Sequence, residues 1–284
     1  MTGDTPLNVH VYVVPMRPVP DPAAEAAGIR PMWSPCSSTL ITGETEALLV
    51  DTLITYDQVD ALADWIKGFE KRLVGVLLTH GHSDHTIGLA RLQEHFPGLR
   101  GLATKDVLAR AQFEAANLGY YWHGVFRDQI PAQPALPELL DADTISLDSH
   151  PLRVIDIGQG DTESSTILHI PQIDAVVAGD VCYNQVHMMN AYTDDAARQP
   201  WITSLDAIAA LKPSTVVSGH KRVGAPDSPD TIEQSQQYLR DLSRVAAEQD
   251  TVEGIVAEML KLHGDRDNPY TLWLSARGVA GNRG

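Results

Sequence analysis

An α/β fold is what the sequence predicts, and two observations carry the prediction. Short apolar runs with strand character alternate with segments whose apolar residues recur at helical spacing along most of the 284-residue chain. Histidine and aspartate side chains also follow directly after three of the apolar runs, in the stretch 80–85, at Asp180 and at His220. Loops at strand ends are where α/β proteins place functional groups, so we expect these side chains to meet at one edge.

The elements of the first half follow from their apolar periodicity. We expect strands at 10–16, 38–43 and 46–52, each a short apolar run. Val59, Leu62 and Ile66 lie at helical spacing and predict a helix over 56–72. A buried strand over 72–79 ends at the histidine cluster, and a helix over 86–96 follows it.

The second half repeats this rhythm after a long connection. We expect strands at 150–158, 165–171, 174–180 and 214–220, and helices at 203–211, 229–249 and 252–264. The organisation that we predict is a single domain over 1–284. It carries a helical, Pro-rich insertion at about 105–145 and a C-terminal helical extension at about 229–284.

Composition and charge narrow the function classes. Hydrophobic residues make up 43% of the chain and charged residues 20%, which is ordinary for a soluble globular protein. The formal net charge of −16 argues against a nucleic-acid partner, which would require a basic surface. Two cysteines predict no disulfide framework, and no leader-like or membrane-spanning apolar run is visible. We therefore expect a cytoplasmic protein with a small-molecule substrate and no membrane partner, and a homodimer is left open.

The most informative stretch is THGHSDH, which contains His80, His82, Asp84 and His85. Histidine rings are costly to bury without partners, and they repel one another when they are protonated. A divalent cation removes this conflict, because it binds neutral imidazole and ionised carboxylate. The stretch therefore predicts a metal site.

These residues resemble a known family. The H-x-H-x-D-H pattern at 80–85, the AGD ending at Asp180, the SGH ending at His220 and the LLVDT containing Asp51 are together similar to the metallo-β-lactamase superfamily. The resemblance implies a four-layer αβ/βα sandwich with a two-metal site at one edge. It implies that one ion takes His80, His82 and a third histidine. The other ion would take Asp84, His85 and His220, with Asp180 bridging the two.

One position departs from the family pattern. The third histidine is missing, and Asp161 stands in its place within GQGDTESS. A carboxylate binds Zn²⁺ at about the distance of an imidazole nitrogen, so we expect Asp161 to be a ligand. This oxygen-rich site would shift the preference from Zn²⁺ towards Mn²⁺ or Fe²⁺. A weakened or empty first site, or a turn-capping aspartate without metal, are the alternatives.

The ligand set predicts a metallo-hydrolase with two divalent ions, Zn²⁺ first, that uses a metal-bound hydroxide on a small ester, lactone or related acyl substrate. Asp84 is expected to bind metal and to transfer a proton to the leaving group. Tyr183 follows Asp180 by three residues and resembles a tyrosine that contacts the substrate carbonyl in lactone-cleaving members of the superfamily. Tyr121, Trp122 and His187 are candidate substrate-binding residues.

Four other functions stay open at this point. A glyoxalase-II-like thioesterase would need a basic cluster for an acidic thiol carrier, and none is visible. A β-lactam hydrolase is disfavoured by the missing secretion leader. A mononuclear iron dioxygenase acting on a thiol or persulfide would bind one iron and consume oxygen. The chain could also be a non-catalytic metal-binding protein, in which Asp161 marks a decayed site.

Overall fold

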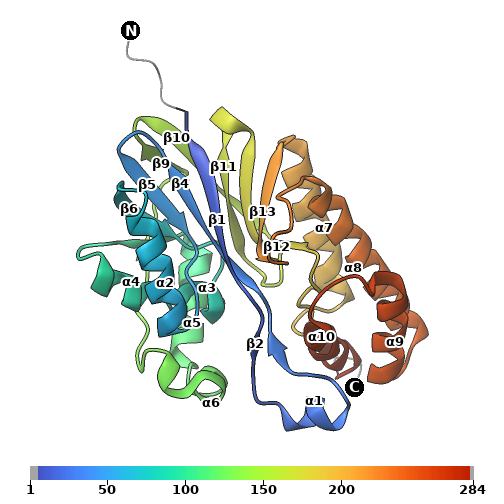
Figure 1. Ribbon diagram of the computed structural model, residues 1–284. Coiled ribbons are helices and arrows are strands. Elements are labelled where there is room, and N and C mark those ends of the chain that lie inside the picture. The colour runs from blue at the N-terminus through green and yellow to red at the C-terminus, as the bar shows by residue number, and fades with distance from the viewer. Residues whose placement is uncertain (1–5, 282–284) are drawn as a thin grey trace.

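A computed structural model describes residues 6–281, and two sheets with helices on their outer faces make up the architecture (Figure 1). The first sheet has the spatial order β1 (Asn8–Val14), β4 (Cys36–Thr42), β5 (Glu46–Val50), β6 (Arg72–Leu77), β7 (Gly101–Ala103) and β8 (Glu138–Leu139). β1, β4 and β5 pair antiparallel, and β5 to β8 run parallel to one another.

The second sheet has the spatial order β13 (Thr215–Lys221), β12 (Ala175–Asn184), β11 (Ser165–Ile170), β10 (His150–Gly158) and β9 (Thr144–Leu147). Its strands pair antiparallel except for β12 and β13, which are parallel. A small ribbon of β2 (Arg17–Pro18) and β3 (Met32–Trp33) stands apart from both sheets and carries the short helix α1 (Pro22–Ala26) at its tip.

The helices form two outer layers. The first sheet is accompanied by α2 (Tyr56–Lys67), α3 (Ser83–Thr86), α4 (Leu89–His95), α5 (Lys105–Ala116), α6 (Trp122–Phe126) and the 3₁₀ turn η1 (Arg127–Gln129). The second sheet is accompanied by η2 (Pro171–Ile173), α7 (Asp195–Ala210), α8 (Asp230–Glu248), α9 (Val252–His263) and α10 (Pro269–Gly281). The two sets of long helices lie on opposite sides of the pair of sheets in Figure 1.

Side chains along the central strands point alternately to the two faces of each sheet, which explains why both faces are covered. In β5, Leu48 and Val50 pack between the two sheets, whereas Leu49 packs outward under α2 and α4. In β12, Val177 faces the inter-sheet core, and Val176 faces the helices of the second half. Both faces of each sheet are thus apolar, as expected for sheets covered on both sides. The four-layer αβ/βα arrangement implied by the resemblance is confirmed.

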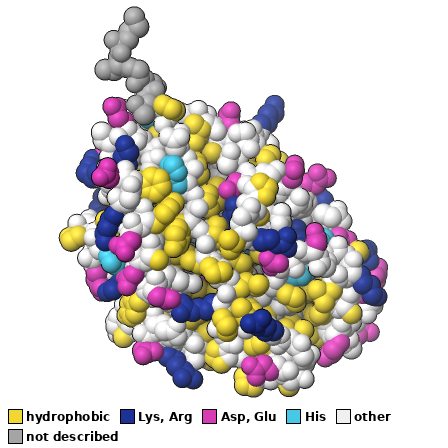
Figure 2. All heavy atoms as spheres, viewed as in Figure 1, with side chains coloured by type: hydrophobic (Ala, Val, Ile, Leu, Met, Phe, Trp, Pro, Cys, Tyr) yellow, Lys and Arg dark blue, Asp and Glu magenta, His cyan; other side chains and the backbone are white. Residues whose placement is uncertain are grey.

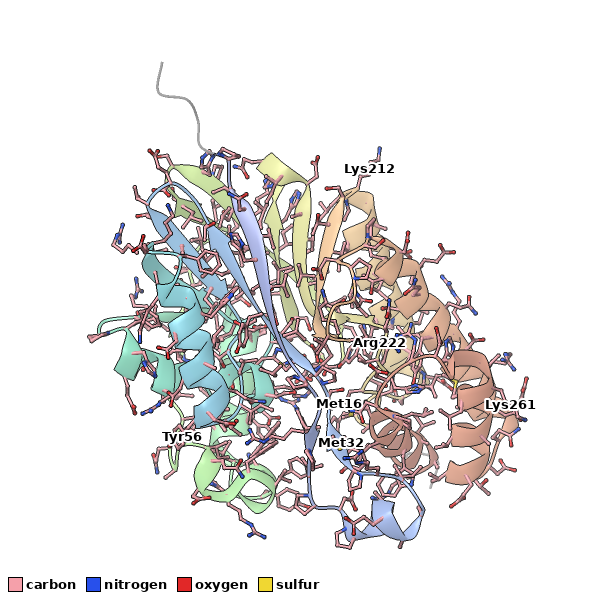
Figure 3. All side chains as sticks on the ribbon, in the orientation of Figure 1. Met16, Met32, Tyr56, Lys212, Arg222 and Lys261 are labelled. Atoms are coloured by element: carbon pink, nitrogen blue, oxygen red, sulfur yellow. The ribbon has the colours of Figure 1, made fainter. Side chains whose placement is uncertain are left out.

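One face of the molecule carries an apolar strip on its surface. Apolar side chains gather along the middle of the face shown in Figure 2, and charged side chains lie mostly towards its flanks. Met16 and Met32 occupy the middle of this face, at the β2–β3 ribbon (Figure 3). In the described part of the chain, no helix combines the length and the apolar character that crossing a membrane requires.

Several element boundaries differ from the sequence expectation: the helix expected over 56–72 ends at Lys67, the strand expected at 10–16 spans Asn8–Val14, and β12 and α7 differ in ways that bear on the site. β12 does not end at Asp180 but continues to Asn184, because Gly179 adopts a positive φ of 52° and the strand resumes pairing beyond an irregular segment. α7 begins at Asp195 rather than at 203, and it contains Pro200. Proline inside a helix removes one backbone hydrogen bond, so the sequence pattern favoured a later start. The Asp194 side chain caps the earlier start by accepting from the Ala197 amide at 2.8 Å.

Candidate metal centre

The loop after β6 delivers the first ligand-type side chains. Asp51 fixes its course, because one carboxylate oxygen accepts from the Thr79 amide and the other from the Thr79 hydroxyl, both at 2.7 Å. His80 and His82 lie in this loop, and α3 follows at once with Asp84 and His85. A strand, a held loop and a short helix thus place four candidate ligands within six residues.

The irregularity in β12 places Asp180. Gly179 lacks a side chain where a Cβ would lie 2.7 Å from the Cβ of Thr79, so the two strand ends approach closely. Backbone groups released from the ladder find other partners: the Trp201 indole donates to the Val181 carbonyl at 2.9 Å, and the Tyr183 amide donates to the Ser235 hydroxyl at 3.2 Å. Helices α7 and α8 therefore hold this bent segment from behind.

Hydrogen bonds on the far side of each ring set its orientation. His85 Nδ1 lies 3.1 Å from an Asp51 oxygen, and His220 Nδ1 lies 2.7 Å from the Pro35 carbonyl oxygen. Both partners are oxygen acceptors, so Nδ1–H donates and Nε2, the atom that would bind a metal ion, faces the centre. The Thr79 hydroxyl donates to Asp51 and therefore accepts from His80 Nδ1 at 3.0 Å, which leaves the His80 Nε2 lone pair facing the centre as well.

Asp180 occupies the middle of the cluster. Its carboxylate oxygens lie 3.1 Å from His220 Nε2, 3.4 Å from His85 Nε2 and 3.9 Å from His80 Nε2. On the same side, Asp84 Oδ2 is 3.3 Å from His220 Nε2. These side chains are almost completely buried.

Asp161 lies on the His80 and His82 side of the cluster. Its oxygens are 2.9 Å from His82 Nδ1 and 3.8 Å from His80 Nε2. One ligand atom from each of these three residues lies within 4.8 Å of the others, which is compact enough for one metal ion. The aspartate that stands in place of the expected third histidine therefore lies beside His80 and His82, where it could act as a third ligand.

The chemistry of the cluster fits divalent cations. Within residues 6–281, buried atoms without a hydrogen-bond partner include Nε2 of His80, His82 and His85 and Oδ1 of Asp161 and Asp180. Unsatisfied buried polar atoms are costly, and here several gather in one place. Three buried carboxylates at one centre also repel one another, and a cation bound between them offsets that repulsion.

The histidine rings of the cluster differ in the direction of their pKa shifts. Burial lowers the pKa of His80 well below its usual value, and the neighbouring rings act in the same direction. Burial also opposes protonation of His82, but the Asp161 carboxylate, together with Asp84 and Glu114, outweighs it and raises the pKa of His82 to about 9. Burial opposes protonation of His220 too, but the Asp180 and Asp84 carboxylates together outweigh it and raise the pKa of His220. A cation at the centre would displace such protons, so metal binding is expected to weaken at low pH.

A cavity of about 550 Å³ opens from this cluster. His82, Asp84, Asp161, Tyr183 and His220 line it at the metal centre. Its remaining walls are largely aromatic and aliphatic. Such a mainly apolar pocket with a few convergent polar groups is the usual form of a small-molecule site.

Comparison with known proteins decides the family. Residues 31–220 match the model of the metallo-beta-lactamase superfamily. The chain belongs to the metallo-β-lactamase superfamily. It is 24% identical over 214 residues to a metallo-beta-lactamase type 2 of Bacteroides fragilis, covering 74% of this chain and 79% of that protein. A metallo-beta-lactamase type 2 of Bacillus cereus is 24% identical over 160 residues, or 56% of each chain.

Solved structures show the same fold. A metallo-beta-lactamase family protein from Thermus thermophilus superposes with a TM-score of 0.63 at 19% identity, covering 96% of this chain and 93% of that one. The metallo-beta-lactamase FIM-1 from Pseudomonas aeruginosa, in its mono-zinc form, gives 0.60 at 19% identity, covering 84% and 97%. Membership in the superfamily supports a metal-dependent hydrolase, and the compact His and Asp groups supply candidate metal sites.

The structure of this superfamily member brings nearly all of the sequence-predicted site residues together. All seven predicted metal ligands lie in one cluster; they are His80, His82, Asp84, His85, Asp161, Asp180 and His220. The Tyr183 hydroxyl donates to Asp180 at 2.7 Å and lies 3.4 Å from Asp161. Tyr121 and Trp122 line the cavity as expected.

His187 is placed differently. The structure corrects the expectation that it borders the pocket, because its ring is fully buried and is absent from the cavity lining. Its Nδ1 lies 3.1 Å from the Tyr238 hydroxyl of α8, and burial lowers its pKa to about 3. A solitary histidine that packs under a helix cannot be told from a pocket histidine by sequence position.

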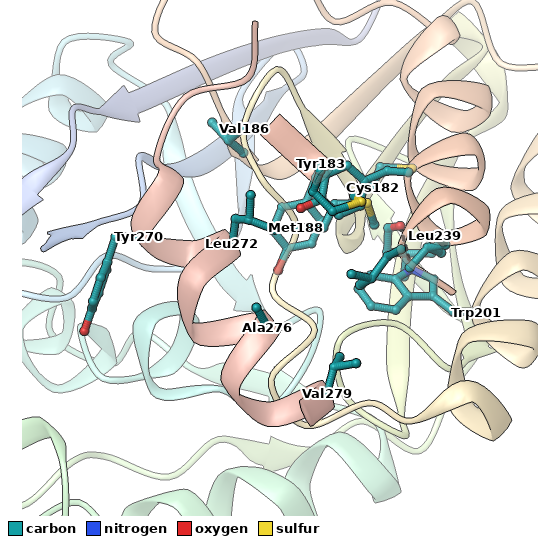
Figure 4. Packing of buried hydrophobic residues seen from close by; sticks show 14 of the residues in the cluster. Cys182, Tyr183, Val186, Met188, Trp201, Leu239, Tyr270, Leu272, Ala276 and Val279 are labelled. Carbon is teal, nitrogen blue, oxygen red and sulfur yellow. Dashed lines mark hydrogen bonds between the residues drawn. The ribbon is translucent and has the colours of Figure 1, made fainter. Parts of the chain in front are cut away.

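Cavity-lining aromatic residues that escaped sequence reasoning include Trp33, Tyr192 and Tyr270. Tyr270 reaches the cavity because α10 packs tightly on the loop before α7, where the Asn190 amide donates to the Ser275 hydroxyl at 2.8 Å. Figure 4 shows Leu272 of α10 facing Met188 while the Tyr270 ring stands on the other side of that helix. No motif marks these residues, and only tertiary packing unites them.

Proposed function

We propose that this chain is a hydrolase of a small ester, lactone or related acyl substrate that works with two divalent ions, Zn²⁺ first. The observation that carries the proposal is the position of the Tyr183 hydroxyl. It lies at the junction between the Asp161 and Asp180 carboxylates and the aromatic cavity. A substrate carbonyl at this junction would meet the ligand cluster and a phenol donor together.

The ligand cluster divides into two sets around Asp180. His80, His82 and Asp161 would hold one ion. Asp84, His85 and His220 would hold the other, with Asp180 shared between them. When bound, such ions polarise a carbonyl oxygen and lower the pKa of water so that a nucleophile is present at neutral pH.

The residues of the chain supply orientation and proton handling. Burial raises the pKa of Tyr183 well above its usual value, and the Asp161 and Asp180 carboxylates add to the effect, so the phenol stays protonated and donates a hydrogen bond. On substrate binding the phenol would turn its single O–H from Asp180 to the substrate carbonyl oxygen and stabilise the negative charge that develops there. Asp84 lines the cavity and is placed to pass a proton towards the leaving group.

The aromatic walls would position the acyl group and exclude water. Trp122 packs against Trp33 with ring centroids 4.9 Å apart, and Tyr121 lies next to both. Aromatic rings present large apolar area at a low cost in side-chain entropy. A flat or aliphatic acyl group is therefore the occupant that these walls favour.

β-Lactam hydrolysis is a second candidate. The relatives from Bacteroides fragilis and Bacillus cereus are metallo-beta-lactamases by name. Hydrolysis of a β-lactam, like that of a lactone, requires a nucleophile to attack the carbonyl carbon of a cyclic acyl group. A substrate panel should therefore include β-lactams beside lactones and esters. Iron-loaded protein should be tested in parallel for oxygen consumption with thiols, which a dioxygenase would show.

Tyr183→Phe tests the proposal. We expect kcat/KM for the best lactone or ester to fall about 100-fold, because one donor to a developing oxyanion is typically worth about 3 kcal/mol. Metal content, measured by mass spectrometry, should be unchanged, since the phenol is not a ligand. Tyr238→Phe is the matched control: it removes a buried hydroxyl that contacts His187 away from the cavity and should change kcat/KM less than about twofold. An unchanged kcat/KM in Tyr183→Phe for every substrate would remove Tyr183 from the reaction.

A further inference from the structure

Arg110 of α5 is the one lining residue with a permanent positive charge among the described residues around the cavity. Its guanidinium is already engaged. Nη2 donates to Glu114 Oε1 at 2.9 Å, and Nη1 donates to Glu163 Oε2 at 3.2 Å. The three charges together leave one net negative charge beside the cavity, so Arg110 offers an incoming anion little attraction.

Packing fixes this arrangement next to the metal loop. A Cβ on residue 81 would lie 2.5 Å from the Cβ of Arg110, so Gly81 allows α5 to approach the loop between His80 and His82. Glu114 Oε2 also accepts from the Ser83 hydroxyl at 3.2 Å, which ties the glutamate to the start of α3. Glu114 is therefore held in place, whereas Glu163 is two-thirds exposed at the end of the cluster.

Four other cations are paired with carboxylates or lie away from the cavity. Lys221 pairs with Asp227, and Arg222 pairs with Asp267 at 2.8 Å. Lys212 and Lys261 lie on the outer side of the second half, away from Met32 at the cavity (Figure 3). The walls that would receive the acyl group of a substrate thus combine apolar rings with carboxylates.

We propose that Glu114 and Glu163, by occupying Arg110, make the cavity select substrates whose acyl group is uncharged and reject those whose acyl group carries a carboxylate. This inference rests on the proposed hydrolase function and names the substrate class for it. A carboxylate on the acyl group would lose its hydration among the aromatic walls and would lie beside Glu114, while Arg110 is already paired with Glu114 and Glu163. A neutral acyl group loses far less on entry.

The test compares two esters with the same leaving group and chain length on the metal-loaded protein. One is p-nitrophenyl hexanoate, and the other is the p-nitrophenyl monoester of adipic acid, which ends in a carboxylate. We expect kcat/KM for the neutral ester to exceed that for the anionic ester by about tenfold or more at low salt, and the ratio to shrink as ionic strength rises. If the anionic ester also bound in a reversed, unproductive pose, kcat and KM would fall by the same factor and kcat/KM would be unchanged. The ratio of the two kcat/KM values therefore reports only on productive binding.

Glu163→Gln frees one edge of Arg110 with little risk to the fold, because Glu163 is exposed. We expect it to raise kcat/KM for the anionic ester by about threefold or more while leaving the neutral ester within about twofold. Glu248→Gln is the matched control, since it removes the same charge from an exposed ion pair with Arg244 on α8 and should alter neither ester. An anionic ester cleaved as well as the neutral one by the parent, or a Glu163→Gln ratio equal to that of the parent, would overturn the inference.

Failure of the proposed function gives a different result. If neither ester nor any lactone is cleaved, the hydrolase proposal fails, and the same two esters then serve as uncleaved ligands. Their binding can be followed by the fluorescence of Trp33 and Trp122, which line the cavity. Tighter binding of the neutral ester would then support the selectivity of the cavity, and equal or weaker binding would overturn it.

Discussion

Replacing Asp180 by asparagine is expected to reduce bound metal from about two ions per chain to one or none and to lower kcat/KM by about 1,000-fold or more. His85, His220 and the Tyr183 hydroxyl all converge on this one carboxylate. An amide of the same shape carries no charge and presents N–H donors on one side. The loss should therefore exceed the roughly 10- to 100-fold that is typical when an outer partner of a ligand is removed.

Metal content by mass spectrometry and kcat/KM on the best substrate check this prediction. Asp60→Asn is a suitable control, because Asp60 likewise contacts a histidine, His95, and also pairs with Arg91, but it lies on α2, away from the cavity. It should keep full metal content and activity. An Asp180→Asn protein with two ions and near-parental activity would contradict the shared position of this carboxylate.

Gly179→Ala is expected to lower the free energy of unfolding by about 2–4 kcal/mol. A positive φ of 52° costs a residue with a Cβ about 1 kcal/mol. The added methyl group would also meet the Thr79 side chain, with the two Cβ atoms only 2.7 Å apart, and overpacking of this kind costs about 1–3 kcal/mol. Since Thr79 also orients Asp51 and His80, metal affinity should fall as well.

Gly28→Ala separates the two contributions. Gly28 has a φ of 74°, and no atom lies within 4 Å of the position that a Cβ would take. It should therefore show only the backbone cost, about 1 kcal/mol, and normal metal content. Urea titration of both variants measures the difference, and equal destabilisation would mean that the Thr79 contact carries no energy.

The metal centre was largely predictable from the sequence for a local reason. His80, His82, Asp84 and His85 lie within six residues, so the loop brings them together in nearly any compact conformation. Asp180 and His220 each follow an apolar run of a neighbouring parallel strand, and such strands end at the same edge. What the pattern missed was the continuation of β12 beyond Asp180, because a bulge at a glycine has no distinct periodicity.

The cavity walls were predictable only in part for the opposite reason. Tyr121 and Trp122 stand in an aromatic cluster that draws attention in the sequence. Trp33 and Tyr270 come from the β2–β3 ribbon and α10, which lie near opposite ends of the sequence and meet only through packing. The ion pairs of Arg110 likewise join Arg110 and Glu114 of α5 to Glu163 in the loop before β11. Nothing in the sequence of either segment indicates that the two segments meet.

The proposed two-ion centre depends most on Asp161 acting in place of the missing histidine, and metal content per chain tests this role directly. The parent and Asp161→Ala should be expressed without added metal and compared by mass spectrometry. We expect about two ions in the parent and about one in the variant, because His80 and His82 lose the third ligand that lies within 4.8 Å of them. The same metal content in both proteins would contradict Asp161 as a ligand, and a single ion in each would contradict the two-ion centre.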